Sequence, residues 1–171
     1  MTERLRRLEY SFQRLPIYFV TACTCERRPI LNNTDVRTGL IEFGEAGGGR
    51  GAWLGAYVLM PDHFHAFVVI DDGRLTLSAW IKSLKNSLSK TLRASGVPAP
   101  HWQKGFFDHI LRSGESYSAK WDYVRENPVR AGLVERAVDY RWSSARYWSR
   151  CPEEDEPLKV DVDKIVWRNR S

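Results

Sequence analysis

The sequence predicts an α+β protein in which one antiparallel sheet carries helices on one face. Stretches rich in β-forming residues alternate with stretches of helical periodicity, in the order β α β β α β α. A Pro-Asp turn alone separates the second and third β-rich stretches, as in a β-hairpin, so these two strands should be antiparallel neighbours. This order is that of the ferredoxin-like βαββαβ fold with one helix and an irregular tail added at the C-terminal end.

The first elements lie between residues 17 and 51. We expect a strand over 17–24, which is rich in β-branched and aromatic residues. N-cap side chains at 33–35 then precede a helix over 36–43, where apolar residues recur at helical spacing. The glycine-rich stretch 44–51 follows a helix, precedes a strand and lacks a closing Gly-Lys-Ser/Thr. We therefore interpret it as a flexible turn rather than a phosphate loop.

A hairpin and a long helix form the centre of the chain. The hairpin pairs strands over 52–60 and 64–70. The helix over 75–95 is the clearest in the sequence, because its leucine and isoleucine residues form one continuous stripe. Lys82 and Lys85 belong to a separate polar stripe. That stripe is either a solvated face or a surface for nucleic acid.

A short strand and a helix complete the predicted order. The strand falls within 102–111, where Asp108 and His109 are either partners of a metal site or polar residues at a strand edge. The helix spans about 117–126 and ends before a proline. Beyond it, 140–148 alternates aromatic residues with arginines. Such a mixture can stack on bases, or it can simply pack the end of the domain.

Composition indicates a folded, basic protein. The 171 residues are 43% hydrophobic and 27% charged, and the net charge of +5 is rich in arginine, which favours a polyanionic partner. Three cysteines without a pairing framework indicate free thiols in a reducing compartment. Neither a signal peptide nor a run of 18 apolar residues occurs, so we expect a cytoplasmic protein without a membrane span.

We divide the chain into one domain over 1–150 and an acidic linker with a short tail over 151–171. Residues 1–15 of the domain form a basic arm with aromatic residues between the arginines. This arm either follows a phosphate backbone or is a solvated terminus. The arginines of the arm that we expect to contact phosphates are Arg4, Arg6 and Arg7.

Two of the four histidines lie just past the predicted turn, where the third strand begins. His63 and His65 are two positions apart, so their side chains share one face, where Phe67 and Val69 follow. Two imidazoles at this spacing can converge on a divalent ion. The same pattern also arises from unrelated polar residues at the start of a strand. With the helices on the opposite face, the pair would point to the uncovered side of the sheet.

A tyrosine and an asparagine could complete a site. Tyr123 and Asn127 are four residues apart, which is one helical turn. Two imidazoles and an amide oxygen would leave open coordination positions, at which a divalent ion could polarise a phosphodiester. A tyrosine beside that ion could attack phosphorus and conserve the phosphodiester bond for rejoining. Alternatively, the asparagine and its proline form an ordinary helix-ending turn and the tyrosine packs against the domain.

These motifs resemble a known family. The stretches Pro61-Asp62-His63-Phe64-His65, 123–134 and Trp142-Ser143-Ser144 are together similar to the REP-associated tyrosine transposases, a branch of the single-tyrosine HUH (insertion-sequence 200-like) transposases. The resemblance covers residues 15–148. It implies a ferredoxin-like endonuclease that cleaves and rejoins single-stranded DNA.

The resemblance also implies roles for particular residues. Tyr123 would be the nucleophile that forms a 5′-phosphotyrosine, and the metal ligands for Mg²⁺ or Mn²⁺ would be His63, His65 and Asn127. Family substrates are palindromic repeats that fold into hairpins, and the basic arm would contact a guide sequence beside them. The asparagine at position 127 and the extended C-terminal region resemble the REP-associated branch, whose members can act as monomers, so the resemblance favours a monomer over a homodimer. The candidate DNA contacts are Arg4, Arg6, Arg7, Lys82, Lys85, Arg125 and Arg130.

Two other functions remain open from the sequence. The chain could be a non-catalytic module that holds structured single strands by charge and stacking, with salt-sensitive binding and no covalent adduct. It could also be a small metal-dependent hydrolase, although four histidines are few for the multi-histidine sites of such enzymes.

Overall fold

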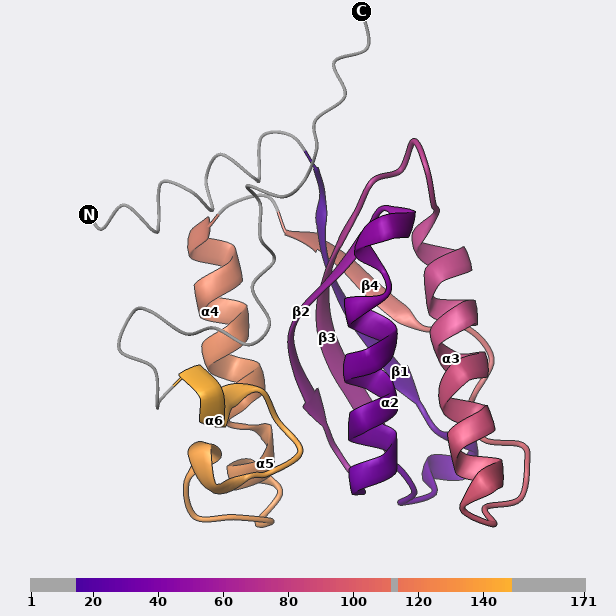
Figure 1. The fold of residues 1–171 in the computed structure, drawn as a ribbon. Coiled ribbons are helices and arrows are strands. Elements are labelled where there is room, and N and C mark those ends of the chain that lie inside the picture. The colour runs from indigo at the N-terminus through magenta and orange to yellow at the C-terminus, as the bar shows by residue number, and fades with distance from the viewer. Residues whose placement is uncertain (1–14, 112–113, 149–171) are drawn as a thin grey trace, which may run out of the picture.

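The computed structural model describes residues 15–111 and 114–148. Within these residues a four-stranded sheet has the order β2-β3-β1-β4 (Figure 1). Every neighbouring pair of strands is antiparallel. The strands are β1 (Ile17–Cys23), β2 (Ala52–Leu59), β3 (His63–Ile70) and β4 (Phe107–Leu111). This is the strand order of the ferredoxin-like βαββαβ fold, so the predicted fold class is confirmed.

Two helices cover one face of the sheet, α2 (Thr34–Glu45) and α3 (Leu77–Ala94) (Figure 1). Each begins at a side chain that caps it: Asn33 accepts a hydrogen bond from the backbone N–H of Val36, and Thr76 accepts one from Ala79. The apolar stripe predicted for the second helix is buried against the sheet. It consists of Leu77, Ile81, Leu84, Leu88 and Leu92, and Trp80 is buried with it.

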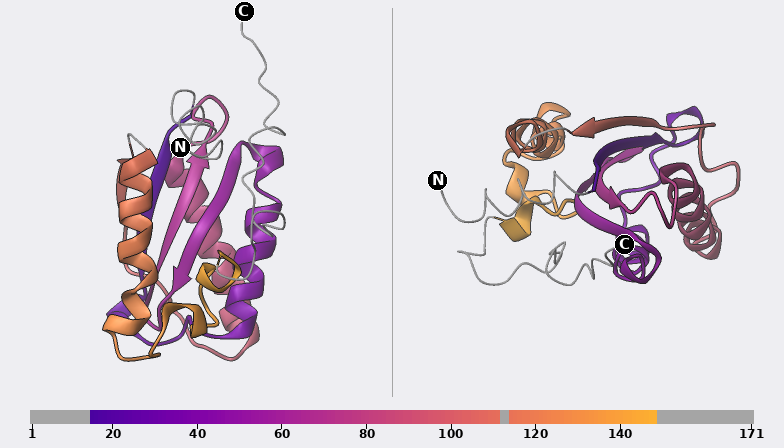
Figure 2. Two further views of the ribbon diagram at one scale, coloured as in Figure 1. Left: turned by 90° about the vertical axis from the view of Figure 1, so that its left-hand side faces the viewer. Right: turned by 90° about the horizontal axis from the view of Figure 1, so that it is seen from above.

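The opposite face of the sheet is covered as well, by α4 (Gly114–Arg125) and by the segment that follows it (Figure 2). Trp121 packs edge-on against Phe67, with ring centroids 6.1 Å apart. The expectation of an uncovered second face is therefore wrong. The physical reason is that Phe19 and Phe67 point to that side and would otherwise expose their rings to water.

The segment after α4 contains two short helices, α5 (Asn127–Arg130) and α6 (Ala145–Trp148). Between them the chain joins the outer edge of β2. The Tyr140 hydroxyl donates a hydrogen bond to the carbonyl of Leu59 at 2.8 Å, and the Ser144 hydroxyl accepts one from the N–H of Tyr57 at 2.9 Å. The hydrogen bonds of Tyr140 and Ser144 support the interpretation that these residues of the stretch 140–148 pack the end of the domain.

Within 15–111 and 114–148, three short 3₁₀ turns connect the elements: η1 (Cys25–Arg27), η2 (Gly48–Arg50) and η3 (Ala137–Asp139). The glycine-rich stretch is a compact turn, in which Gly51 has φ 89° and its N–H donates to the carbonyl of Gly48. A side chain at Gly51 would be strained in this left-handed conformation. Among the described residues, the helices are too short or too polar to cross a membrane.

Candidate active site

The two histidines of β3 lie side by side on the face that α4 covers. Their ring centroids are 4.8 Å apart, and the ring of His65 also stacks on Phe19 at 5.4 Å. The strand register places Cys23 opposite His63 and Thr21 opposite His65. Alternation along the strand therefore sets both imidazoles on one surface, as the sequence predicted.

Each imidazole has a hydrogen-bond partner at Nδ1. The Nδ1 atom of His63 lies 2.7 Å from a carboxylate oxygen of Asp62, and the Nδ1 atom of His65 lies 2.7 Å from the hydroxyl of Thr21. Because a carboxylate only accepts, Nδ1 of His63 carries a proton, and in the neutral form of the ring the lone pair is on Nε2. Partners of this kind orient histidines that bind metals through Nε2.

Burial and neighbouring cations keep the second imidazole neutral. Desolvation is the largest cause that lowers the pKa of His65 to about 3, followed by the charges of His63, Lys120, Arg27 and Arg130. A neutral ring is the form that can donate a lone pair to a metal. The same cations create a positive potential around the histidine pair, which is suited to a phosphate group.

Tyr123 and Asn127 come from the end of α4 and the start of α5. Tyr123 is exposed, with 62% of its surface accessible, and Asn127 is half-buried. Arg130 connects them: its guanidinium lies 4.0 Å from the centroid of the Tyr123 ring and donates hydrogen bonds to the Tyr123 carbonyl and to the Asn127 amide oxygen. Trp121 of α4 packs against Phe67, which shares a sheet face with His65, so α4 lies over the face that carries the histidine pair.

The donor set fits a divalent ion in part. Both imidazoles can offer Nε2, and the amide oxygen of Asn127 accepts a hydrogen bond from Arg130, which engages one of its two lone pairs. Among the described residues, no group of three or more His, Cys, Asp or Glu side chains is arranged to hold a metal. The guanidinium beside the Asn127 amide would oppose a metal ion bound there, because both are cations.

Two of the candidate DNA contacts lie on the opposite side of the sheet from the histidines. Lys82 and Lys85 are on α3, which covers the sheet face opposite the histidines. Lys82 is exposed, whereas the ammonium of Lys85 donates to the backbone carbonyls of Gln103 and Gly105, and burial lowers its pKa. Lys85 thus stabilises the loop before β4. Arg4, Arg6 and Arg7 lie outside the described residues.

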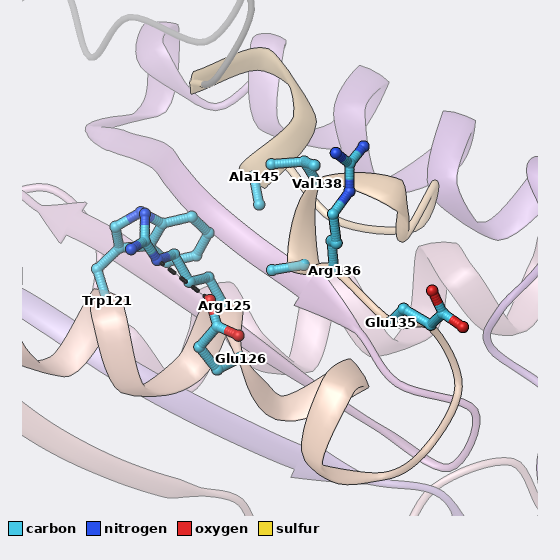
Figure 3. Close-up of a pocket in the computed structure, with 8 residues that line it drawn as sticks. Trp121, Arg125, Glu126, Glu135, Arg136, Val138 and Ala145 are labelled. Carbon is cyan, nitrogen blue, oxygen red and sulfur yellow. Dashed lines mark ion pairs between the residues drawn. The ribbon is translucent and has the colours of Figure 1, made fainter.

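Arg125 lines a pocket of about 410 Å³ between α4 and the segment 135–145 (Figure 3). It forms ion pairs with Asp122 at 3.3 Å and with Glu126 at 3.7 Å. Residues two apart on a helix do not face each other, so Arg125 and Tyr123 point in different directions. Its role as a DNA contact stays a prediction, as does that of exposed Arg130.

Sequence reasoning missed several parts of the site. Asp62 was visible in the motif before the first histidine, but its pairing with His63 was not inferred. Thr21 carries no local signal, because only the register of two strands distant in sequence brings it to His65. Asp108 and His109 are exposed on β4, which agrees with the strand-edge interpretation.

Fold and site together define an α+β protein of the ferredoxin-like class, with a paired-histidine site beside a tyrosine-bearing helix. No family model matches the chain. The chain is 25% identical over 91 residues to the REP-associated tyrosine transposase of Escherichia coli K12, a match that covers 53% of each protein. A Haemophilus influenzae protein that provisionally bears the same name is 27% identical over 103 residues, covering 52% of this chain and 56% of that one.

These matches span about half the length of the curated relatives. A solved structure of a REP-associated tyrosine transposase bound to a REP hairpin shares the fold, with a TM-score of 0.65 and 24% identity over 91% of this chain and 86% of that chain. The comparisons confirm the resemblance to the REP-associated tyrosine transposases.

Proposed function

We propose that this protein is a cytoplasmic, metal-dependent transposase that cleaves and rejoins single-stranded DNA at hairpin-forming repeats through a 5′-phosphotyrosine. The observation that carries the proposal is the pair of imidazoles, each with Nδ1 hydrogen-bonded, on the sheet face that the Tyr123 helix covers. The names of the relatives support the class of reaction, and the hairpin bound to the structural neighbour supports the class of substrate.

His63 and His65 would hold Mg²⁺ or Mn²⁺, with the amide oxygen of Asn127 as a third ligand once Arg130 moves to a DNA phosphate. Bound there, the ion would withdraw charge from the scissile phosphate. Arg130 lies over the Tyr123 ring, so this exchange would occur next to the nucleophile.

The phenol oxygen of Tyr123 would attack phosphorus and lose its proton to solvent. The bond from phosphorus to the 3′ oxygen breaks and this oxygen takes a proton from solvent, so the DNA keeps a free 3′-hydroxyl while its 5′ phosphate stays on the tyrosine. Attack by another 3′-hydroxyl reverses the step and releases the phenol. One phosphodiester is exchanged for another in each direction, so no ATP is needed.

The test uses a labelled single-stranded hairpin from repeats that flank the gene, with Mn²⁺ or EDTA, on a denaturing gel. We expect a shifted covalent band that requires the metal and is lost in Tyr123→Phe. The matched control is Tyr18→Phe, because Tyr18 lies on the other sheet face and its hydroxyl bonds only weakly to Asp72 at 3.4 Å. A covalent band in the Tyr123→Phe protein would overturn the assignment.

A non-catalytic binding module is the second candidate. Arg130 favours it, since the guanidinium beside the Asn127 amide would oppose a metal ion bound there. A native gel of the same samples separates the two functions: retention of the hairpin there, without a covalent band on the denaturing gel in any metal, would support the binding module.

A further inference from the structure

We propose that Phe107 stacks on a base of the single-stranded DNA bound at the histidine site. The inference rests on the proposed function and adds a residue that positions the substrate. Phe107 begins β4 and exposes 59% of its surface, although an aromatic ring of this size gains most when it is buried. The sheet's own packing therefore does not account for the ring.

The strand register places this ring on the same surface as the imidazoles. His65 pairs with Thr21, and Thr21 pairs with Phe107, so the three residues form one row across β3, β1 and β4. Residues directly opposite each other in antiparallel strands share a face. Two strand spacings amount to roughly 10 Å. A nucleotide next to the one at the histidines could therefore reach the ring.

The charge on this surface favours a nucleic acid over an apolar protein segment. The ammonium of Lys120 lies 5.0 Å from the centroid of the Phe19 ring, in the row next to Phe107. Arg27 lies at the same surface, since its guanidinium donates a hydrogen bond to the sulfur of Cys23, which is opposite His63 in the register. A flat aromatic ring beside cationic side chains is the arrangement with which proteins hold single strands.

The test measures hairpin binding by fluorescence anisotropy in EDTA, so that binding is separated from cleavage. Loss of a single base stack weakens binding by about 5-fold to 140-fold, and we expect a loss in this range for Phe107→Ala. Phe107→Trp keeps a stacking surface and should bind within about twofold of the wild type. The matched control is Ile110→Ala: Ile110 is also exposed on β4, at 44%, but points to the other face.

A second arm places single abasic sites along the strand that flanks the hairpin. An abasic site at the position whose base stacks on Phe107 should weaken binding by the wild type. The same abasic site should not weaken binding by Phe107→Ala, because the substitution has already removed that stack. Equal binding by Phe107→Ala and the wild type, with every abasic site acting alike on both, would overturn the inference. If the wild type binds no hairpin at all, the proposed function itself fails. Melting temperatures confirm that each variant is folded.

Discussion

Removal of the Asp62 carboxylate should weaken metal binding without unfolding the loop that carries it. One carboxylate oxygen accepts a hydrogen bond from Nδ1 of His63 at 2.7 Å, and the other pairs with Arg27 at 2.7 Å. The loop itself is held by backbone atoms, because the N–H and the hydroxyl of Thr24 both donate to the Asp62 carbonyl at 2.9 Å. Asp62→Ala leaves those two bonds in place.

The size of the effect follows from what the carboxylate does. Hydrogen-bond partners of metal-binding histidines typically contribute about 10- to 100-fold in metal affinity, or about 1.4–2.8 kcal/mol. Asp62→Ala removes both the acceptor and the negative charge, and it leaves the Arg27 cation unpaired near the metal. Asp62→Asn keeps an acceptor for His63, so its loss should be smaller. Combining Asp62→Asn with Arg27→Gln should recover part of that loss, because the local charge is restored.

The assay titrates metal-free protein with Mn²⁺ and counts free ions by electron paramagnetic resonance. The expected order of affinity is wild type, then Asp62→Asn, then Asp62→Ala, with His63→Ala as the reference for loss of a ligand. A folded Asp62→Ala protein that binds Mn²⁺ within twofold of the wild type would refute the reasoning. So would a wild-type affinity that His63→Ala does not change.

Two further predictions concern Arg130 and Tyr140. Arg130→Ala should tighten Mn²⁺ binding by about threefold to tenfold, because it frees the Asn127 amide and removes a nearby cation. The same substitution should weaken DNA binding. Weaker Mn²⁺ binding by Arg130→Ala in the Mn²⁺ titration would contradict this prediction. Tyr140→Phe should lower the free energy of unfolding by about 1 kcal/mol at pH 8, measured with denaturant, since the bond to the Leu59 carbonyl is lost. Burial raises the pKa of Tyr140 to about 12, above the value of about 10 in the unfolded chain. Wild-type stability should therefore fall between pH 10 and 12, and the difference between the two proteins should narrow there; a constant difference would contradict the assignment.

The sequence predicted the element order because the signals for it are local. Alternation over β3 and the leucine stripe of α3 each depend on residues within one element, and both were found where expected. The strand order then followed from the known pattern of such elements. What the sequence did not predict was the layer on the second face, because nothing in α4 alone indicates that Trp121 lies against Phe67.

The candidate site was likewise predictable only where the signal lies within one element. His63 and His65 could be placed on one face from spacing alone, whereas Thr21 reaches His65 only through the pairing of two strands. Lys85 was grouped with solvent-facing or DNA-facing charges because its helical position is polar. Its ammonium instead binds carbonyls of a loop about 20 residues away, a contact that depends on how that loop folds back.

The hydrogen bonds between β2 and the segment 140–144 have a consequence for synthesis on the ribosome. The residues that form hydrogen bonds with the outer edge of β2 lie 81 to 87 positions further along the chain. At about 5–20 residues per second, that edge waits roughly 4–17 s before its partner is made. An unpaired strand edge can pair with another nascent chain. During this interval β2 is complete and its partner is not, so the outer edge of β2 is open to pairing with another chain.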